Sequence, residues 1–141
     1  MKIRKATMRD AKEITRLLNS DEGYLKIYLG DGFDLSDVRD YLNQKLNRVY
    51  VCEIDKKIAG VFIAQFWKNY IHSHLIFVDK NYQGIGIGRA LMNFRDNLAM
   101  KNGKFLIESF VEEDNLKMQK ILKGRDYAKG KKYICFYKKL K

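Results

Sequence analysis

The feature that most constrains the fold is the junction LIFVDKNYQGIGIGRALM, residues 75–92. Residues 72–78 resemble a strand, and apolar side chains at helical spacing predict a helix over 89–100. A loop between a strand and a helix start places free main-chain N–H groups at the positive end of the helix dipole. Three alternate glycines cost conformational entropy that an ordinary turn does not need, so we interpret the loop as an anion site.

Two common phosphate-binding motifs do not fit this loop. A P-loop requires G-x-x-x-x-G-K-[ST], and the chain contains no Gly-Lys-Ser/Thr. A Rossmann site requires its glycines in the first β-α unit, whereas here they begin at Gly84, and too little chain follows to complete a doubly wound sheet. The anion must therefore be bound by another architecture.

The rest of the chain alternates strand-like and helix-like segments. Thr7 begins a capping-box-like start to a helix that ends near Asn19, and Asp34 or Ser36 can cap a second helix. We expect strands and further helices over these ranges: strands 3–5, 49–54, 58–67 and 104–111, a helix at 114–123, and a final hairpin over 127–140. The prediction is an α/β (α+β) fold in one domain, residues 1–141, with a mixed central sheet of about six to seven strands flanked by about four helices.

Composition favours a cytoplasmic globular protein. Apolar residues make up 46% of the 141 residues, enough for a core, yet no apolar run approaches the ~20 residues that span a bilayer. The start MKIRKATMRD lacks the apolar stretch of a secretory signal. Cys52 and Cys135 both lie in strand-like stretches, as buried thiols of a reducing compartment do, and nothing supports a disulfide. We expect no membrane association.

The net charge of +11 is unevenly distributed. Eight Lys or Arg residues face one acid, Asp126, between Lys123 and Lys141, while acids dominate between Ser20 and Asp40. Most of these charges are solvated surface. The polarity nevertheless suits a protein that binds an anionic ligand on one side and a cationic ligand on the other.

A family resemblance connects these features. The stretch Q-G-I-G-I-G, Gln83–Gly88, matches the [QR]-x-x-G-x-[GA] acyl-coenzyme A signature of the GNAT superfamily of N-acetyltransferases, and the expected element order resembles that fold over essentially the whole chain. VCEIDKKIAGVFIA resembles its second and third strands, and Asn115 lies where a helix-starting asparagine often contacts the cofactor. The resemblance implies acetyl-coenzyme A (acetyl-CoA) as cosubstrate and no metal.

The resemblance also implies how acetyl-CoA is bound. The pantetheine arm would pair with a splayed fourth strand near Phe77 and Val78, and the amide of Val78 would stabilise the developing oxyanion. The acceptor amine attacks directly, so neither cysteine needs a catalytic role. Asn115 and the loop backbone would complete the cofactor site, the loop amides belonging to Gln83, Gly84, Ile85, Gly86, Ile87, Gly88 and Arg89.

The catalytic acid and base are less well marked. Where some relatives carry a glutamate base, this chain has His72, with His74 on the same strand face and Glu108 as a second candidate base. The alternative is that the histidines are only polar residues on a half-exposed strand. H-x-H is a weak metal motif because no third ligand stands nearby. The usual proton-donating tyrosine is replaced by Leu122, which leaves Tyr127 or Tyr133, or an unassisted thiolate.

For the acceptor, the acidic and aromatic segment between the first two helices favours a cationic small-molecule or peptide amine. We expect it to contact Tyr24, Tyr28 and Asp31, through charge and cation–π attraction. Two other functions stay open: a degenerate acyl-CoA sensor, because of Leu122, and a nucleic-acid-binding module using the basic C-terminal stretch. Nucleic acid is the less favoured partner because the aromatics there have strand spacing typical of a core. The chain is expected to be a monomer or a homodimer.

Overall fold

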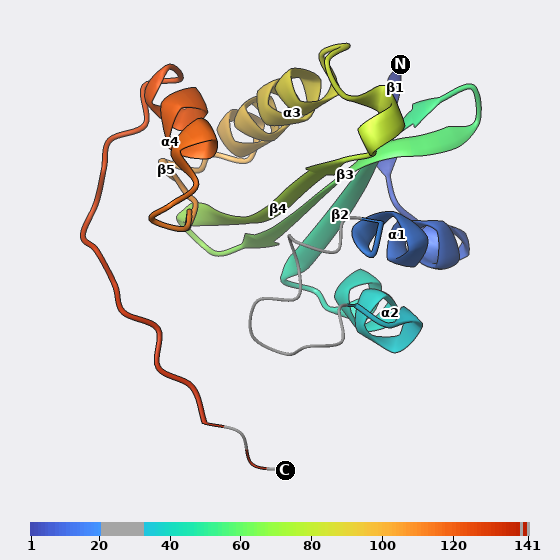
Figure 1. Cartoon of the computed structure of the whole chain (residues 1–141), viewed down its shortest axis with the longest axis horizontal. Coiled ribbons are helices and arrows are strands. Elements are labelled where there is room, and N and C mark those ends of the chain that lie inside the picture. Colours follow the sequence, from blue (N-terminus) through green and yellow to red (C-terminus); the bar gives the residue numbers. More distant parts are fainter. Residues whose placement is uncertain (21–32, 139, 141) are drawn as a thin grey trace. The chain divides into compact units, whose positions relative to one another are not determined.

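A computed structural model of the chain describes residues 1–20, 33–138 and 140. The chain divides into two compact units, Met1–Phe110 and Val111–Lys141. The first unit holds a five-stranded sheet in the order β1-β2-β3-β4-β5 (Figure 1). Neighbouring strands are antiparallel except β4 and β5, which are parallel. The mixed α/β class is confirmed, with five strands in the described residues rather than six or seven.

The element bounds follow the predicted pattern closely as far as the fifth strand. The strands are β1 (Lys2–Lys5), β2 (Asn47–Ile54), β3 (Lys57–Phe66), β4 (Tyr70–Val78) and β5 (Leu106–Glu108). The α-helices are α1 (Ala11–Leu18), α2 (Leu35–Asn43), α3 (Ile87–Lys101) and α4 (Leu116–Lys123). Short 3-10 turns precede two of them, at Met8–Asp10 and Lys80–Tyr82.

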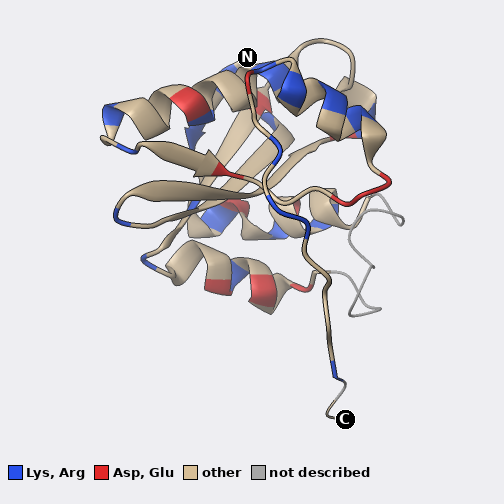
Figure 2. Ribbon diagram, turned by 90° about the vertical axis from the view of Figure 1, so that its left-hand side faces the viewer, with Lys and Arg blue, Asp and Glu red and all other residues tan. Residues whose placement is uncertain are grey.

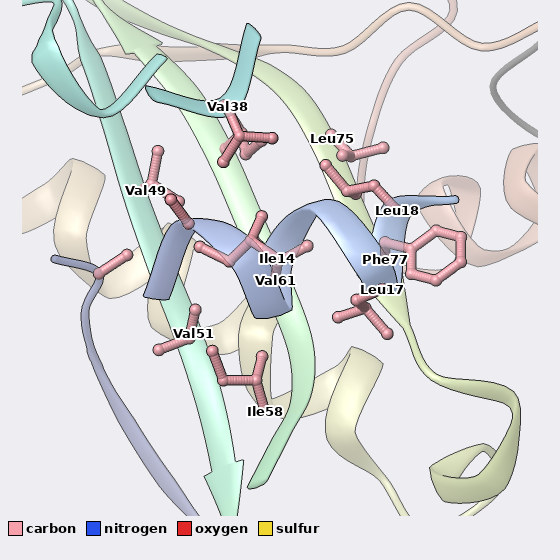
Figure 3. Packing of buried hydrophobic residues seen from close by; sticks show 13 residues of the cluster. Ile14, Leu17, Leu18, Val38, Val49, Val51, Ile58, Val61, Leu75 and Phe77 are labelled. Carbon is pink, nitrogen blue, oxygen red and sulfur yellow. The ribbon is translucent and has the colours of Figure 1, made fainter. Parts of the chain in front are cut away.

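The two faces of the sheet bury separate apolar clusters. On one face, α1 inserts Ile14, Leu17 and Leu18 against alternate residues of the central strands (Figure 3). On the other face, α3 contributes Ile87 and Leu91 to a second cluster. Each fully buried aliphatic side chain contributes roughly 1.5–3 kcal/mol. The two clusters fix β4 between α1 and α3, which positions the residues discussed below.

Reciprocal caps start the first two α-helical segments. The amide of Thr7 donates to Asp10 Oδ2 at 2.7 Å, which confirms the predicted capping box with an aspartate in place of the usual glutamate. Asp34 is the cap of α2, since the amide of Asp37 donates to Asp34 Oδ1 and the amide of Asp34 donates to Asp37 Oδ2, both at 2.9 Å. Of the two predicted caps, Asp34 is therefore used.

Strand β4 changes its pairing along its length. Its pairing with β3 shifts register between Ser73 and Leu75, so that His74 is an extra residue without a partner on β3. Its pairing with β5 covers only three residues, Tyr70 to His72. Bulges of this kind bend a strand and re-aim its side chains. Beyond His72, β4 and β5 part, and the far edge of β4 is left open.

The second unit departs from the sequence prediction. Asn115 caps α4 as expected, its side chain accepting from the amide of Met118 at 3.1 Å. The predicted hairpin over 127–140 is wrong, because the described residues of that range form no strand. The expectation that its aromatics are core is wrong for Tyr133, Phe136 and Tyr137, which are 78%, 90% and 68% exposed, whereas Tyr127 is half-buried. Cys135 is exposed, whereas Cys52 is buried in β2, and both are free thiols.

The sequence predicts no membrane-spanning segment. Within the part of the chain that the structure describes, no helix combines the length and apolar character needed to cross a bilayer.

Candidate functional site

The edge of β4 that faces away from β3 presents main-chain amides next to the glycine loop. The amide of Asp79 donates to the carbonyl of Ala59 on β3 at 2.9 Å. Because backbone groups alternate in direction along a strand, the amides of Val78 and Ile76 point away from β3, toward the open edge. The side chain of Gln83 lies on that edge and donates to the carbonyl of Val78 at 3.3 Å. The main-chain groups of Phe77, by the same alternation, point toward β3.

The loop that follows β4 has a backbone that requires glycine at two positions. Buried Asp79 accepts from the amide of Asn81 at 2.9 Å and starts the short 3-10 turn. Gly84 and Gly86 then have φ values of +84° and +94°, a region that side-chain-bearing residues rarely adopt. A Cβ at either position would meet no atom within 4 Å. The backbone is therefore bare on that side, whereas Gly88 has no positive φ and lies near Val78.

The amides of residues 84–89, in this loop and the first turn of α3, have no acceptor within the described chain. The first helical bond is the one from the amide of Ala90 to the carbonyl of Gly86, at 2.9 Å. The amide of Gln83 is used locally by the carbonyl of Lys80, at 3.4 Å. The donors that remain belong to residues 84–89, at the positive end of a helix of 15 residues. Such a set of donors suits a phosphate or diphosphate.

Two predicted polar residues meet where β4 and β5 part. His72 on β4 is opposite Glu108 on β5, and Nδ1 of His72 lies 2.9 Å from Oε1 of Glu108. A carboxylate only accepts, so Nδ1 carries the proton and donates it, and in the neutral ring the lone pair is on Nε2. The His72 side chain is 15% exposed, and the ring of Phe110 lies 4.9 Å from it, centroid to centroid. The pair has the form of an oriented base.

The bulge residue His74 lies on the same face of β4 and contacts α2. Its Nε2 lies 3.1 Å from the hydroxyl of Tyr41, and its ring centroid lies 6.1 Å from that of His72. Partial burial lowers the pKa of His74, and the charge of a protonated His72 lowers it further. Burial raises the pKa of Tyr41, with an added effect of Asp37. Both shifts favour the neutral forms of the two side chains, which share a hydrogen bond between the hydroxyl and Nε2.

Helix α2, which carries Tyr41, also carries acidic residues. Asp37 and Asp40 are in α2, the helix that carries Tyr41 (Figure 2). They belong to the acidic stretch that the sequence associates with a cationic acceptor. Three residues predicted to bind the acceptor, Tyr24, Tyr28 and Asp31, lie outside the described residues.

Three other predicted positions belong to the second unit. Asn115 is half-buried at the start of α4, and Tyr127 is half-buried after its end, its amide donating to the carbonyl of Leu122 at 3.1 Å. Leu122 is buried in α4 and carries no group that donates a proton. Among the described residues, no cluster of three or more His, Cys, Asp or Glu side chains could hold a metal ion.

Two residues near the site were not predicted to have a role. Neither Tyr41 of α2 nor Arg95 of α3 was named as a site residue from the sequence. Arg95 follows Leu91 by four residues and precedes Ala99 by four, so its spacing places it on the buried face of α3. That spacing is the signal that could have found it, although a lone arginine on a helix is usually exposed.

Comparison with known proteins connects these features to one family. The sequence model of the acetyltransferase (GNAT) domain matches residues 45–140. An uncharacterized N-acetyltransferase of Methanocaldococcus jannaschii is 34% identical over 73 residues, which cover 47% of this chain and 32% of that protein. The chain thus spans about a third of the length of that curated relative.

Solved structures share the fold at low sequence identity. An aminoglycoside acetyltransferase from an uncultured soil metagenomic sample, in complex with sisomicin, has a TM-score of 0.77 at 18% identity, covering 99% of this chain and 96% of its own. A ribosomal-protein-alanine N-acetyltransferase of Brucella melitensis has a TM-score of 0.80 at 17% identity, with coverages of 97% and 100%. The acetyltransferase AAC(6')-Iy, in complex with a bisubstrate analogue of coenzyme A and acetylneamine, has a TM-score of 0.77 at 15% identity, with coverages of 98% and 97%.

Proposed function

Because the chain belongs to the GNAT acetyltransferase family, we propose that it transfers an acetyl group from acetyl-CoA to a primary amine by direct attack in a ternary complex. The observation that carries this proposal is the open edge of β4 next to the bare amides of residues 84–89. A diphosphate bound at those amides would direct the attached chain along the adjacent free strand edge. The geometry of the residues present is thus compatible with acetyl-CoA.

Each part of acetyl-CoA has candidate partners on this chain. The loop amides would bind the diphosphate, with Gln83 bordering the strand edge. The outward amide of Val78 would donate to the thioester oxygen and stabilise its negative charge in the transition state. Because the main-chain groups of Phe77 point toward β3, we assign strand pairing of the pantetheine arm to Val78 and Ile76, with Phe77 supporting them from the core.

The amine must lose a proton as it reacts. Its nitrogen attacks the thioester carbon, the new C–N bond forms, the C–S bond breaks and the sulfur leaves as a thiolate. His72 Nε2, oriented by the bond from Nδ1 to Glu108, accepts the proton from the amine directly or through water. The negative charge of Glu108 stabilises the imidazolium that results.

The departing thiolate takes up a proton from a donor group. Buried Leu122 occupies the position of the usual tyrosine, and we propose Tyr127 as the replacement donor. The same leucine favours a second candidate function, in which a chain without turnover binds acyl-CoA as a sensor. Measured release of free thiol from acetyl-CoA with any amine would exclude the sensor.

We propose a cationic small-molecule or peptide amine as acceptor. The acidic stretch that includes Asp31, Asp37 and Asp40 supports this, with Tyr24 and Tyr28 as apolar or cation–π partners. Aminoglycosides are the substrates of two solved structures that share the fold. A panel of polyamines, aminoglycosides, amino acids and basic peptides would identify the class, and cytoplasmic acetyl-CoA would supply the donor.

Two glycines at opposite ends of α3 allow a matched test. Gly86 and Gly103 both have positive φ, and a Cβ at either would meet no atom within 4 Å. Alanine at either position should destabilise the fold by roughly 1–2 kcal/mol through backbone strain alone. Only Gly86→Ala should also weaken binding of acetyl-CoA, by roughly tenfold or more in Kd, because it disturbs the donor loop. Thermal unfolding and calorimetric titration measure the two effects.

The result separates the proposal from its alternatives. Equal acetyl-CoA affinity in the two variants would overturn the assignment of the loop as the diphosphate site. No binding of acetyl-CoA by the unaltered protein, together with salt-sensitive stabilisation by RNA or DNA, would instead support the nucleic-acid-binding module. That module has some support from the exposed Tyr133, Phe136 and Tyr137.

A further inference from the structure

A buried arginine lies directly behind the proposed active-site strand. Arg95 of α3 is 1% exposed, the lowest value among the charged residues that the structure describes. Its Nε and Nη2 donate to Asp96 Oδ1 at 2.9 and 2.8 Å, and its Nη1 donates to the hydroxyl of Ser73 at 3.3 Å. Burying a charge costs several kcal/mol before its partners compensate. This cost suggests that the buried Arg95 has a function.

Ser73, the residue that Arg95 contacts, lies where three parts of the structure meet. Ser73 lies between His72 and His74 in β4, at the register shift opposite β3. Its carbonyl accepts from the hydroxyl of Ser109 at 3.4 Å, immediately after Glu108. The pairing of β4 with β5 ends one residue before it. Ser73 thus connects α3, the bulge and the residue that follows Glu108.

We propose that Arg95 is a positioning residue, which holds Ser73 and thereby fixes the geometry of His72 with Glu108 where β4 and β5 part. Ser73 points to the α3 side, so its neighbour His74 points to the opposite side, where it contacts Tyr41 of α2. Anchoring Ser73 from behind fixes the rotation of the strand at this point. The Ser109 bond holds the end of β5 beside the same residue. Only the catalytic consequence of this inference rests on the proposed function.

The expected cost of losing the anchor is in catalysis rather than in stability. Arg95→Met keeps most of the side-chain volume and removes the charge, and Asp96 is partly exposed and can turn to water. Removing one partner of an ion pair is costly when the other charge is left buried, and Asp96 avoids most of that cost because its side chain is 29% exposed. A displacement of about 1 Å at a catalytic group, by contrast, can lower the rate by about 100-fold.

The experiment compares Arg95→Met with Lys101→Met, which removes an exposed cation at the end of the same helix. The first readout is the tautomer of His72 by ¹⁵N NMR of the imidazole nitrogens, and a His74→Gln variant assigns the signals because the chain has two histidines. Arg95→Met should lose the Nδ1–H preference of His72 and lower kcat by about 10- to 100-fold. The KM for acetyl-CoA and the Tm should match the control.

A second variant keeps the proposal testable if Arg95→Met does not fold. Ser73→Ala removes the hydroxyl that Arg95 holds and should change the tautomer and kcat in the same direction, by less. An unchanged His72 tautomer in whichever of these variants folds would overturn the proposal. If the unaltered protein acetylates no amine, the proposed function fails, but the tautomer comparison still decides the role of Arg95.

Discussion

The first unit contains two polar networks of different chemical character. One joins Arg4 to Asp10 and Glu53, with the guanidinium of Arg4 making a two-pronged contact to Asp10 at 2.9 Å on each side. The other joins Glu108 to His72 and Tyr41 to His74. The first connects β1 to β2 and the first cap, while the second lies where β4 loses its partner strand.

The two networks respond differently to pH because they contain different titratable side chains. Hydrogen bonding to Arg4 lowers the pKa of Asp10 to about 2, so this carboxylate keeps its charge in mildly acidic solution. The pKa of His74 is lowered from 6.5, so the folded protein favours its neutral form and loses stability as the pH falls through 6.5. One network is built from permanent charges and suits a structural role. The other contains two imidazoles, the side-chain type used most often as a general base, which suits catalysis.

The largest expected difference between the two networks is in their effect on kcat. His72→Ala removes the proposed base and should lower kcat by about 100-fold or more, with little change in the KM for acetyl-CoA, because general-base catalysis contributes about 10²–10⁴ in rate. Steady-state assays of thiol release measure both constants.

A pair of glutamates provides the control for that prediction. Glu108→Gln and Glu53→Gln each remove a carboxylate that lies 2.9 Å from its basic partner. Glu108→Gln should lower kcat, whereas Glu53→Gln should leave it unchanged and lower the free energy of unfolding by at most about 1 kcal/mol. Equal effects of the two on kcat would remove the functional distinction between the networks.

An intermediate effect is expected on stability. Asp10→Asn should lower the free energy of unfolding at neutral pH by about 1–2 kcal/mol, because it loses the pairing with Arg4. The folded-state pKa of Asp10 is depressed, so its contribution is present above about pH 4 and is lost as the pH falls toward 2. Urea unfolding at several pH values measures this dependence.

Asp37→Asn is the matched control for that substitution. Asp37 has the same place in its capping box as Asp10, and no arginine contact is observed at its carboxylate among the described residues. Its replacement should cost less, and the difference between the two variants reports the arginine pair. If both variants lose equal stability, the Arg4 network contributes nothing beyond its cap.

The helix caps and the glycine turn could be predicted from the sequence, because residues only a few positions apart determine them. Thr7 with Asp10 shows its cap by spacing alone, Asp34 was one of two predicted caps of the next helix, and the glycines at 84 and 86 mark a backbone that the structure confirms. The failed hairpin over 127–140 shows the limit. Alternating apolar residues there match a strand, but strand formation requires a partner, which no local pattern supplies.

The arrangement of the site depended on long-range contacts. His72 and Glu108 were separate candidates for the base, and only the parallel register of β4 and β5 shows them to be a pair. The bulge at His74 leaves no mark in the sequence, although it places His74 and Leu75 on the same face. Arg95 was not named from the sequence, although its spacing places it on the buried face of α3, because a lone arginine on a helix is usually exposed.

The smallest expected effect concerns the link between α2 and the histidines. Tyr41→Phe keeps the ring beside His74 and removes the hydroxyl that hydrogen-bonds to its Nε2. A single such bond contributes about 1 kcal/mol, so kcat/KM should fall by no more than about fivefold at neutral pH. Tyr50→Phe is the control, since Tyr50 is half-buried on the other face of the sheet against Phe62 and Phe94. If Tyr41→Phe behaves as Tyr50→Phe does, His74 acts without help from α2, and the catalytic network ends at His72 and Glu108.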